Sequence, residues 1–571
     1  MNIETIRQLF NNKQWQTCIE ACLKLIMQQR TNIEAWSLCA FCYNNIGQLQ
    51  EAIKCLEDAL KIAKKHHKEH VFTLSLNLAE FYRRNNMTLQ AIALLQNLLP
   101  KDDENLHFNL AKCYGDLQDY ERSIQHYMIA IKINPKDIHA IFNLANQQAA
   151  IGSFKLALKY YSLAYESGMG DAGINLAQIY TNLDDLESAI TLYRESDIRY
   201  VINLAHLYLS LNEFQTGFAL YEHRRVMLPK TMDRHFLDSS FQDSKSILDF
   251  LQDKRVALYH EQGFGDSIMF ARFIPLLSCK EKIIFAPKEL CKIFSCFNVC
   301  CSEKVHDDYD VALPLPSLAF LFDNEKSVKV GLESFRNTLL SFLIKSQIKD
   351  SNGLKDSMLS DTFIHTNMTE SQISIKKVLE SYQHYAQKEE LKDDVFLSTK
   401  AQAKNHFITN THNAIETKKQ IKIALNFSSN PNFQNAREKS IYAQKLLESL
   451  PHKNFTYYSL QYEGIDSGLA KEFSVIDMSK EIKDFYDSAR ILLNMDFVIS
   501  IDSALAHLSA TLGIPTAVLL YKRHDWRWGR FCKHDSSVWY DNTKLFIQED
   551  LHEWRGVLEK LNAFLKQTFK G

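Results

Sequence analysis

A glycine-containing turn with one acidic residue is the first place in the chain where chemistry is expected. Residues 260–267 have the sequence HEQGFGDS and directly follow the mainly apolar run that ends at residue 260. Gly263 and Gly265 allow a tight turn and a close approach to the backbone, and the following segment is expected to begin a helix. Asp266 would then lie near a helix N-terminus, where a carboxylate can act as a general base. The third glycine of the dinucleotide fingerprint is missing, and Asp266 could instead simply cap the helix.

A second candidate site follows the apolar run 497–501. Asp502 and Ser503 come directly after that run and begin a segment of small and apolar residues that is expected to be helical. The free N–H groups and the positive dipole end of such a helix suit a phosphate group. His507 lies one turn further on, although a single histidine on a helix is more often structural.

Both candidate sites need sheets to position them, and the pattern of the second half predicts two. Short apolar runs alternate with helical segments, which is typical of parallel α/β folds. The predicted strands form two series, 255–260, 282–286 and 310–313, then 421–427, 455–460, 497–501 and 515–520. The simplest arrangement is two nucleotide-binding-type lobes with a cleft between them.

The predicted domain boundaries follow from changes in this pattern. A connector is expected at 229–253, an N-terminal Rossmann-like lobe at 254–323 and a C-terminal Rossmann-like lobe at 420–571. Between the lobes, residues 324–419 are rich in Lys, Ser, Asn and Asp with weak periodicity. We interpret them as a polar insertion, partly helical near Ile373–Glu390 and otherwise mobile.

The first half of the chain is a repeat array. The tripeptide Asn-Leu-Ala recurs five times at steps of 32, 34, 32 and 28 residues, and a second helix in each copy carries a small residue. Small residues let paired helices approach closely. The period and the residue pattern resemble the tetratricopeptide repeat, with six or seven copies expected over residues 1–228. Stacked repeats of this kind form an α-solenoid whose groove binds peptide segments.

The repeated asparagine is a candidate for binding an extended polypeptide. The five copies are Asn77, Asn109, Asn143, Asn175 and Asn203. A carboxamide both donates and accepts hydrogen bonds, so a column of them could hold an extended peptide through its backbone. This resembles the asparagine ladder of O-GlcNAc transferases. The alternative is that these residues solvate the turn and recur only through repeat duplication.

Taken together, the motifs resemble the lipopolysaccharide heptosyltransferase family of GT-B glycosyltransferases, and more closely bacterial proteins that fuse tetratricopeptide repeats to such a domain. The resemblance is carried by the motifs Tyr221-Glu222-x-Arg224, Glu261-Gln262-Gly263-x-Gly265-Asp266, Asn430-Pro431-Asn432, Arg437-x-Lys439-Ser440, Ser459-Leu460-Gln461, Asp502-Ser503 with His507, Asp525-Trp526-Arg527-Trp528, Trp539-Tyr540 and Leu545-Phe546-x-Gln548. It implies an α-solenoid followed by a GT-B-like double Rossmann fold. Ala436 and Lys439 depart from the usual residues of the fused family.

The resemblance also implies roles for individual residues. Asp266 corresponds to the catalytic base, while Arg437 and Lys439 would neutralise the donor diphosphate. The other residues expected to bind the donor are Gly263, Gly265, Asn430, Gln461, Asp502, Ser503 and His507. Enzymes of this fold need no metal, and no cofactor is expected beyond the nucleotide-sugar substrate.

The function implied is a protein O-glycosyltransferase whose repeats recruit the acceptor. Members of the fused group include flagellin glycosyltransferases that transfer a nonulosonic acid such as pseudaminic acid. Two alternatives stay open: a peptide-binding scaffold or secretion chaperone with an inactive GT-B domain, and an enzyme of the lipopolysaccharide core. The run Asp525–Trp528 could be a platform for a sugar and its carboxylate, or could merely pack the final helix under the lobe.

Composition limits the other classes of function. Lys and Arg number 66 against 68 Asp and Glu among 571 residues, which argues against a nucleic-acid or anionic-membrane binder. No run of about 18 apolar residues predicts a membrane span, and a cytoplasmic location is expected. The twelve cysteines show no paired zinc-knuckle spacing, and we expect them to be reduced and mostly buried.

Overall fold

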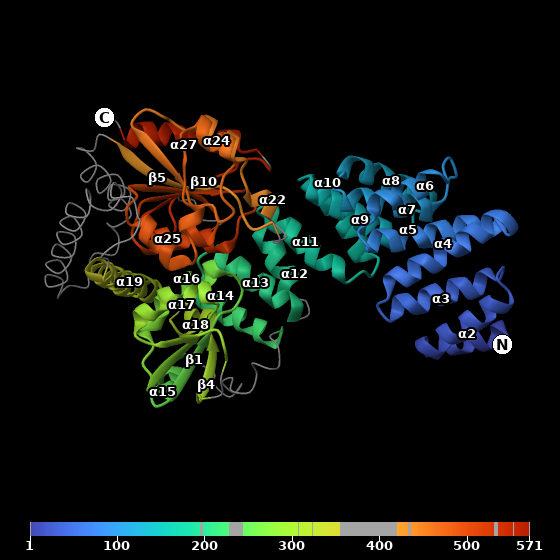
Figure 1. The fold of residues 1–571 in the computed structure, drawn as a ribbon, viewed down its shortest axis with the longest axis horizontal. Helices are drawn as coiled ribbons and strands as arrows, with labels where there is room; N and C mark the ends of the chain where they lie inside the picture. Colours follow the sequence, from blue (N-terminus) through green and yellow to red (C-terminus); the bar gives the residue numbers. More distant parts are fainter. Residues whose placement is uncertain are drawn as a thin grey trace. The chain divides into compact units, whose positions relative to one another are not determined.

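The computed structural model describes residues 2–194, 198–227, 244–305, 308–322, 324–353, 420–431, 436–529, 535–551 and 553–569. The chain divides into two compact units, residues 1–195 and 196–571. The predicted end of the solenoid at residue 228 therefore does not coincide with the boundary between the units. The first unit is entirely helical, and the second combines one further helical hairpin with two parallel sheets (Figure 1).

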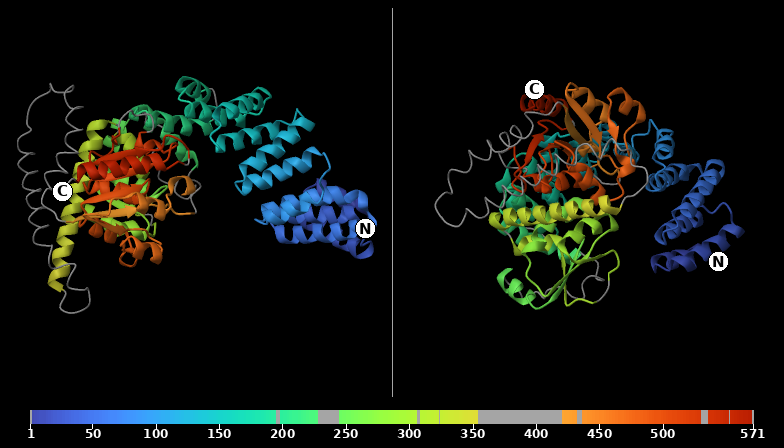
Figure 2. Two further views of the ribbon diagram at one scale, coloured as in Figure 1. Left: turned by 90° about the horizontal axis from the view of Figure 1, so that it is seen from above. Right: turned by 60° about the vertical axis from the view of Figure 1, so that its left-hand side comes forward.

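Helical hairpins stack side by side in the first unit (Figure 2). Its helices are α1 (Ile3–Asn11), α2 (Trp15–Gln28), α3 (Ile33–Asn45), α4 (Leu49–His66), α5 (Val71–Arg84), α6 (Thr88–Gln96), α7 (Glu104–Asp116), α8 (Tyr120–Ile133), α9 (Ile138–Ala150), α10 (Phe154–Glu166), α11 (Asp171–Asn182) and α12 (Leu186–Arg194). The turn inside each hairpin from α3 onward contains a residue with positive φ, such as Gly47 at 80° or Asn86 at 60°. A left-handed residue of this kind ends the first helix and lets the chain reverse.

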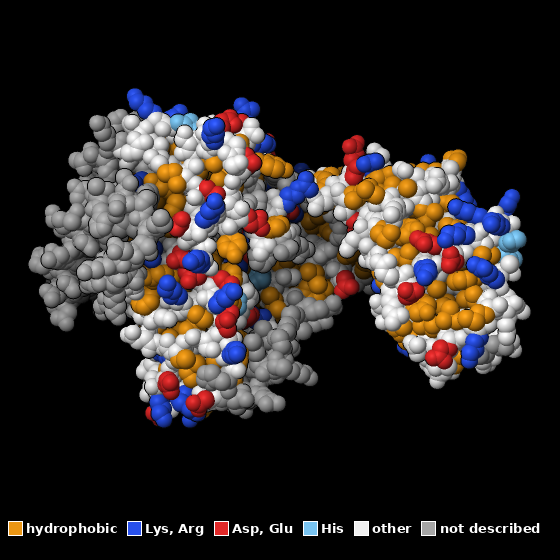
Figure 3. Space-filling view, in the orientation of Figure 1, with side chains coloured by type: hydrophobic (Ala, Val, Ile, Leu, Met, Phe, Trp, Pro, Cys, Tyr) orange, Lys and Arg blue, Asp and Glu red, His pale blue; other side chains and the backbone are white. Residues whose placement is uncertain are grey.

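Small residues bring the paired helices together, as the repeat pattern predicts. The alanine of every Asn-Leu-Ala copy is fully buried, namely Ala79, Ala111, Ala145, Ala177 and Ala205. The small residues of the second helices are equally buried at Ala91, Ser123, Ala157 and Ala189. Buried cysteines fill the core of the first hairpins at Cys18, Cys22, Cys39, Cys42 and Cys55. On the face seen in Figure 3, larger apolar patches lie over α3 and α4.

The last hairpin, α13 (Ile198–Ser210) and α14 (Phe214–Tyr221), belongs to the second unit. Its Phe214 and Phe218 pack against Trp539 with ring centroids 5.1 and 6.1 Å apart. An alanine methyl at Gly217 would lie 2.7 Å from Leu209, so the two helices approach as closely as glycine allows. This hairpin therefore shares the apolar core of the α/β region.

The first sheet has four parallel strands in the order β3-β2-β1-β4. They are β1 (Arg255–Tyr259), β2 (Glu281–Phe285), β3 (Cys300–Ser302) and β4 (Val311–Pro314), and the helical elements between and around them are η2 (Glu222–Met227), α15 (Ser244–Leu251), α16 (Phe264–Phe270), η4 (Ala271–Leu276), α17 (Lys288–Phe294), η5 (Ser295–Phe297), η6 (Leu315–Ser317) and α18 (Leu318–Leu321). Val256 of the central strand pairs with Lys282 on one side and Val311 on the other. The predicted connector 229–253 ends in α15, and its residues 229–243 lie outside the described residues.

The second sheet has six parallel strands in the order β10-β9-β8-β5-β6-β7. They are β5 (Ile421–Asn426), β6 (Phe455–Ser459), β7 (Ile476–Asp477), β8 (Phe497–Ile501), β9 (Thr516–Leu520) and β10 (Thr543–Ile547), with α22 (Ala436–Lys439), α23 (Ala443–Ser449), α24 (Ser467–Glu472), η7 (Ser479–Glu481), α25 (Phe485–Leu492), α26 (Ala504–Thr511), η8 (Trp526–Trp528) and α27 (Arg555–Thr568). All seven predicted strands are present within a residue or two, whereas β3, β7 and β10 were not predicted.

The polar insertion predicted from residue 324 begins instead with a well-packed helix, α19 (Glu325–Gly353). Its buried residues Val328, Leu332, Phe335, Leu339 and Leu343 recur every three or four positions. Figure 2 shows α19 between the two sheets. Arg336 of α19 donates to the carbonyl oxygens of Thr511 and Ala510 at the end of α26, at 2.9 and 3.2 Å. The first part of the predicted insertion is thus a structural link between the lobes, while residues 354–419, with the helix predicted near 373–390, lie outside the described residues.

Candidate functional site

The turn after β1 places Asp266 on the first turn of α16. Gly263 is the N-cap of that helix, and its amide donates to Asp266 Oδ2 at 3.2 Å. The capping role that the sequence left open for Asp266 is therefore present. Gln262 precedes the glycine with a φ of +67°, a conformation that residues other than glycine seldom adopt. Such strained residues persist only where the surroundings hold them in place.

Gly265 lies where the two lobes touch. A methyl group added there would lie 2.9 Å from the His507 ring and 3.5 Å from the Ala504 Cα on α26. Because α16 follows the carboxyl end of β1 and α26 follows that of β8, the two sheets face each other through their carboxyl ends. Ligands of open α/β sheets bind at these ends, beside the strands where the chain order reverses.

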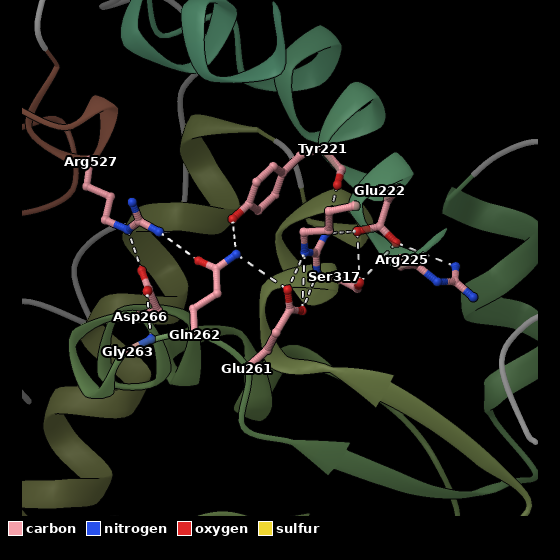
Figure 4. A network of polar contacts seen from close by, with 10 residues as sticks. Tyr221, Glu222, Arg225, Glu261, Gln262, Gly263, Asp266, Ser317 and Arg527 are labelled. Atoms are coloured by element: carbon pink, nitrogen blue, oxygen red, sulfur yellow. Dashed lines mark hydrogen bonds and ion pairs between the residues drawn. The ribbon is translucent and has the colours of Figure 1, made fainter. Parts of the chain in front are cut away.

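Arg527 of the C-terminal lobe binds Asp266 of the N-terminal lobe through Nε and Oδ1 (Figure 4). The same guanidinium contacts Asp525 at 2.6 Å and donates to Gln262 Oε1 at 3.0 Å. The side chains of Arg527 and Asp266 are only 13% and 11% exposed. Burial raises the pKa of Asp266 even though the guanidinium opposes the shift. Burial would also raise the pKa of Asp525, but Arg527 lowers it to about 2.

The last repeat hairpin holds the other side of this turn. Tyr221 Oη accepts a hydrogen bond from Gln262 Nε2 at 2.5 Å. Arg224 of η2 donates to both oxygens of Glu261 at distances between 2.9 and 3.2 Å, and to Ser317 at 3.1 Å. Figure 4 shows this chain of contacts running from the hairpin to Arg527. Two motifs that the sequence showed separately, Tyr221–Arg224 and Glu261–Asp266, are thus bound to each other.

On the C-terminal lobe, Asp502 is held from two sides. Lys439 Nζ approaches Asp502 Oδ2 at 2.6 Å, and Trp528 Nε1 donates to Oδ1 at 2.8 Å. Burial would raise the pKa of Asp502, but the Lys439 ammonium holds it below the usual value. Lys439, predicted to neutralise the donor diphosphate, is therefore paired with a carboxylate of its own lobe.

Hydroxyl and amide groups gather between the carboxyl ends of β5 and β8. Ser503 caps α26 by accepting from the Ala506 amide at 3.3 Å, and its hydroxyl lies 2.9 Å from that of Ser500. Asn426 donates to Ser503 at 3.4 Å, while its Oδ1 is buried with no partner in the described part of the chain. A buried oxygen without a partner is unusual, and it marks a candidate contact for water or a ligand.

The loop after β5 is shaped by Gln461. Its Oε1 accepts from the amides of Phe427 and Ser428 at 3.1 and 3.3 Å, and its Nε2 donates to the Ser428 carbonyl at 2.9 Å. Gln461 therefore fixes the backbone of Phe427 and Ser428 at the start of the loop that carries Asn430. Asn430 at the end of this loop and Arg437 on α22 are exposed, and Asn432 lies outside the described residues.

His507 lies inside the lobe. It is 2% exposed, its ring stacks on Trp528 at 4.7 Å, and its Nδ1 is 3.0 Å from Tyr540 Oη. Burial lowers the pKa of His507 to about 3, so the ring is neutral near pH 7. This placement favours the structural alternative over the predicted contact with the donor.

The run Asp525–Trp528 joins the two predicted sites. Trp526 packs against Tyr221, with ring centroids 6.1 Å apart, and Trp528 lies over His507. Both indoles are buried, so they offer no face to a sugar. The two tryptophans therefore pack inside the protein, which was one of the two interpretations of this run. They contact the last hairpin and α26, whereas that interpretation placed them under the final helix. Sequence reasoning missed Gln262, Tyr221 and Arg224 as site residues, although each stands in a quoted motif.

The asparagine column lies on the first helix of successive hairpins. Asn77, Asn109, Asn143 and Asn175 belong to α5, α7, α9 and α11 of the first unit, Asn203 belongs to α13 of the second, and all five are half-buried. The amides of Asn77 and Asn109 have no hydrogen-bond partner among the described residues. Further along, Asn175 donates to Asn146 Oδ1 at 3.1 Å, and Tyr161 donates to the same oxygen at 2.5 Å.

Two cavities open on the first unit beside this column. One of about 300 Å³ is lined by Asn143, Asn146 and Gln147 together with Arg83, Lys112, Gly115, Asp116, Tyr120, Tyr127 and Ala150. The other, of about 630 Å³, lies at the start of α7 and α9 and includes Asn105, Phe108 and His139. Arg83 and Lys112 are paired with Glu80 at 2.9 and 3.0 Å. The smaller cavity therefore offers amides beside cations that are already paired.

Comparison with known proteins agrees with this description of the first unit. The tetratricopeptide repeat family model matches residues 33–66, 105–137 and 174–197. The N-terminal hairpins are tetratricopeptide repeats. A search of curated proteins finds no match to the chain. Within the described residues, no helix is long and apolar enough to cross a lipid bilayer.

Three solved structures illustrate the similarity in fold. MamA is 20% identical and covers 30% of this chain and 98% of its own, with a TM-score of 0.26. YrrB, described as a tetratricopeptide repeat protein with an unusual peptide-binding site, is 18% identical over 36% of this chain and 99% of its own, with a TM-score of 0.27. A tetratricopeptide repeat protein from Parabacteroides merdae is 15% identical over 39% and 91%, with a TM-score of 0.34.

Proposed function

We propose that the protein is a GT-B-type O-glycosyltransferase that moves a sugar from a nucleotide-sugar donor to a Ser or Thr hydroxyl of a protein recruited by the repeats. The observation that carries the proposal is the close approach of the Gly265-Asp266 turn to the start of α26 and to Arg527, across the carboxyl ends of two parallel sheets. The strand orders also support it, because both sheets follow the doubly wound pattern of Rossmann lobes.

In the proposed reaction, Asp266 takes the proton of the acceptor hydroxyl. The hydroxyl oxygen forms a bond to the anomeric carbon of the sugar, while the bond from that carbon to the donor phosphate breaks. The electron pair leaves with the phosphate, which the free amides of α26, Ser503 and exposed Arg437 would stabilise. The buried acceptor oxygen of Asn426 would bind a hydroxyl or amide group of the donor.

The repeat groove supplies the acceptor in this proposal. Tetratricopeptide repeats commonly bind peptide or protein partners, and the amides of Asn77, Asn109 and Asn143 lie where an extended chain could contact them. The family resemblance implies flagellin as the acceptor and a nonulosonic acid as the sugar. Because backbone contacts read little of the side chains, the groove would accept several polar sequences.

The test is transfer in vitro. The full chain is incubated with flagellin and a panel of nucleotide sugars, and intact-mass spectrometry records an added sugar. Asp266→Asn is the informative variant, because its amide oxygen can still accept from Gly263 and cap α16, whereas the base is lost. Asp310→Asn, which removes an Asp–Arg pair at the amino end of the same sheet, is the matched control. Transfer by Asp266→Asn at the wild-type rate would exclude the proposed role of Asp266.

A second candidate is a peptide-binding scaffold without catalysis. The pairing of Asp266 with Arg527 and of Lys439 with Asp502 favours it, because the charge of each group is already neutralised by a protein partner. A scaffold would keep its cellular phenotype in Asp266→Asn and lose it when the groove asparagines become alanine. The opposite pattern would favour the enzyme.

A further inference from the structure

Asp266 is a weak base while its present contacts last, because the Arg527 cation stabilises its charged form. Its Oδ2 accepts from the Gly263 amide, and its Oδ1 is bound by Arg527 Nε. The amide contact lies within α16 and would persist in any conformation of that helix. Of these two contacts, the one with Arg527 crosses between the lobes, so it is the one whose opening would make Asp266 a stronger base.

The charges around Arg527 favour such an exchange. One guanidinium serves two carboxylates, Asp266 and Asp525, while Lys439 is matched by Asp502. Asp525 comes from the same loop as Arg527 and also accepts from its backbone amide at 3.1 Å. Asp266 is therefore the partner that can be replaced without unfolding the loop. Two carboxylates at one cation repel each other, and low polarity strengthens that repulsion.

We propose that Arg527 exchanges Asp266 for an anionic group of the donor, a phosphate or a sugar carboxylate, so that binding of the donor frees the base. The inference rests on the proposed function and adds a binding residue to it. A guanidinium suits this exchange because its planar fork matches phosphate and carboxylate equally well. The freed Asp266, whose pKa burial raises, is a stronger proton acceptor than a carboxylate bound to arginine.

Gln262 keeps Arg527 near the site during the exchange. Its side chain binds Arg527 Nη2 through Oε1 and the Tyr221 hydroxyl through Nε2, while its backbone holds a φ of +67°. Neither hydrogen bond involves Asp266, so both can remain when only the contact between Asp266 and Arg527 opens. Gln262 is thus a positioning residue for Arg527.

The experiment measures binding instead of turnover, using calorimetry on the full chain near pH 7. The phosphate probes are cytidine 5′-monophosphate and uridine 5′-diphosphate, and the carboxylate probe is N-acetylneuraminate. Asp266→Asn removes the competing charge, so we expect it to bind the matching probe about 3- to 10-fold more tightly than the wild type. Arg527→Gln should bind that probe at least about 10-fold more weakly. Asp310→Asn should equal the wild type, and melting curves without ligand verify that each variant is folded.

The outcomes separate this inference from the proposed function. Tighter binding of a phosphate probe by Asp266→Asn assigns Arg527 to the phosphate, and tighter binding of N-acetylneuraminate assigns it to the carboxylate. If the wild type binds a probe and Asp266→Asn binds it no more tightly, the exchange is wrong while the glycosyltransferase proposal stands. If the folded wild type binds none of the probes and transfers no sugar, both are wrong.

Discussion

Arg224, at the end of the last repeat hairpin, holds Glu261 of the turn after β1 with three hydrogen bonds of 2.9 to 3.2 Å. Both side chains are nearly inaccessible to water, and Ser317 completes the contact. The turn that carries Asp266 is therefore fixed from the repeat side as well as from its own sheet. The hairpin acts as part of the proposed active site and not only as the end of the solenoid.

Replacing Arg224 with alanine should strongly destabilise the second unit. The change leaves Glu261 nearly buried without its cation and Glu222 with Arg225 alone, and breaking a buried pair in this way typically costs about 3–5 kcal/mol in the free energy of unfolding. Urea denaturation of the full chain measures the loss. Arg225→Ala is the control, because Arg225 contacts Glu222 at 3.6 Å and is more exposed, so it should cost no more than about 1 kcal/mol. Equal losses in the two variants would contradict this assignment.

Replacing Gly265 with alanine should separate the lobes slightly. The new methyl group would press on the His507 ring, and overpacking of this kind costs about 1–3 kcal/mol. Thermal unfolding reports the change in stability, and weaker nucleotide binding would report the change in cleft geometry. Gly556→Ala on α27 meets nothing within 4 Å and should be neutral or stabilising by up to about 1 kcal/mol. A Gly265→Ala variant as stable as wild type would show that the lobes are less tightly packed there.

Stability should fall on mild acidification because of His507. Its pKa is lowered from 6.5 to about 3 in the folded protein, so below pH 6.5 the unfolded chain binds a proton that the folded chain does not. The stabilising contribution is thus complete above pH 6.5 and is lost as pH falls toward 3, at up to about 1.4 kcal/mol per pH unit. Unfolding free energies at pH 7, 6 and 5 measure the slope. His507→Gln should reduce the slope, and an unchanged slope in that variant would contradict this assignment.

Replacing Asn109 and Asn143 together with alanine should weaken acceptor binding without unfolding the repeats. Each half-buried amide offers a hydrogen bond worth about 0.5–1.5 kcal/mol, so the double change predicts about 5- to 150-fold weaker binding of the proposed acceptor, flagellin. Fluorescence anisotropy with labelled flagellin measures the affinity. Asn97→Ala, at an exposed helix end outside the column, is the control and should bind like the wild type. Unchanged affinity in the double variant would favour duplication as the reason for the repeated asparagines.

Features with short-range signals were predictable from the sequence. The repeats are recognisable from Asn-Leu-Ala at a nearly constant period, and seven strands were predicted from short apolar runs with nearly correct bounds. The turn at Asp266 was found for the same reason, because its glycines and its carboxylate lie within a few residues. Local patterns of this kind need no knowledge of the tertiary fold.

Contacts between distant segments were not predictable. Arg527 and Asp266 lie 261 positions apart, and the sequence around either residue gives no indication that the two form an ion pair. The apolar residues of α19, such as Phe335 and Leu339, are separated by polar residues, so the segment was interpreted as part of a polar insertion. The burial of His507 could not be predicted from its neighbours in sequence, because it depends on Trp528 and Tyr540, which approach from elsewhere in the chain.

The sharing of one core by the last hairpin and the α/β region has a practical consequence for dissecting the protein. A fragment that starts at residue 229 would lack Phe214 and Phe218, which pack against Trp539. It would therefore expose an apolar surface to solvent near the turn that carries Asp266. Such a fragment should aggregate, and its inactivity would be mistaken for a dead enzyme. A fragment that starts at residue 196 keeps α13 and α14 together with the tryptophans they pack against. A fragment meant to contain only the α/β region must therefore retain the last helical hairpin.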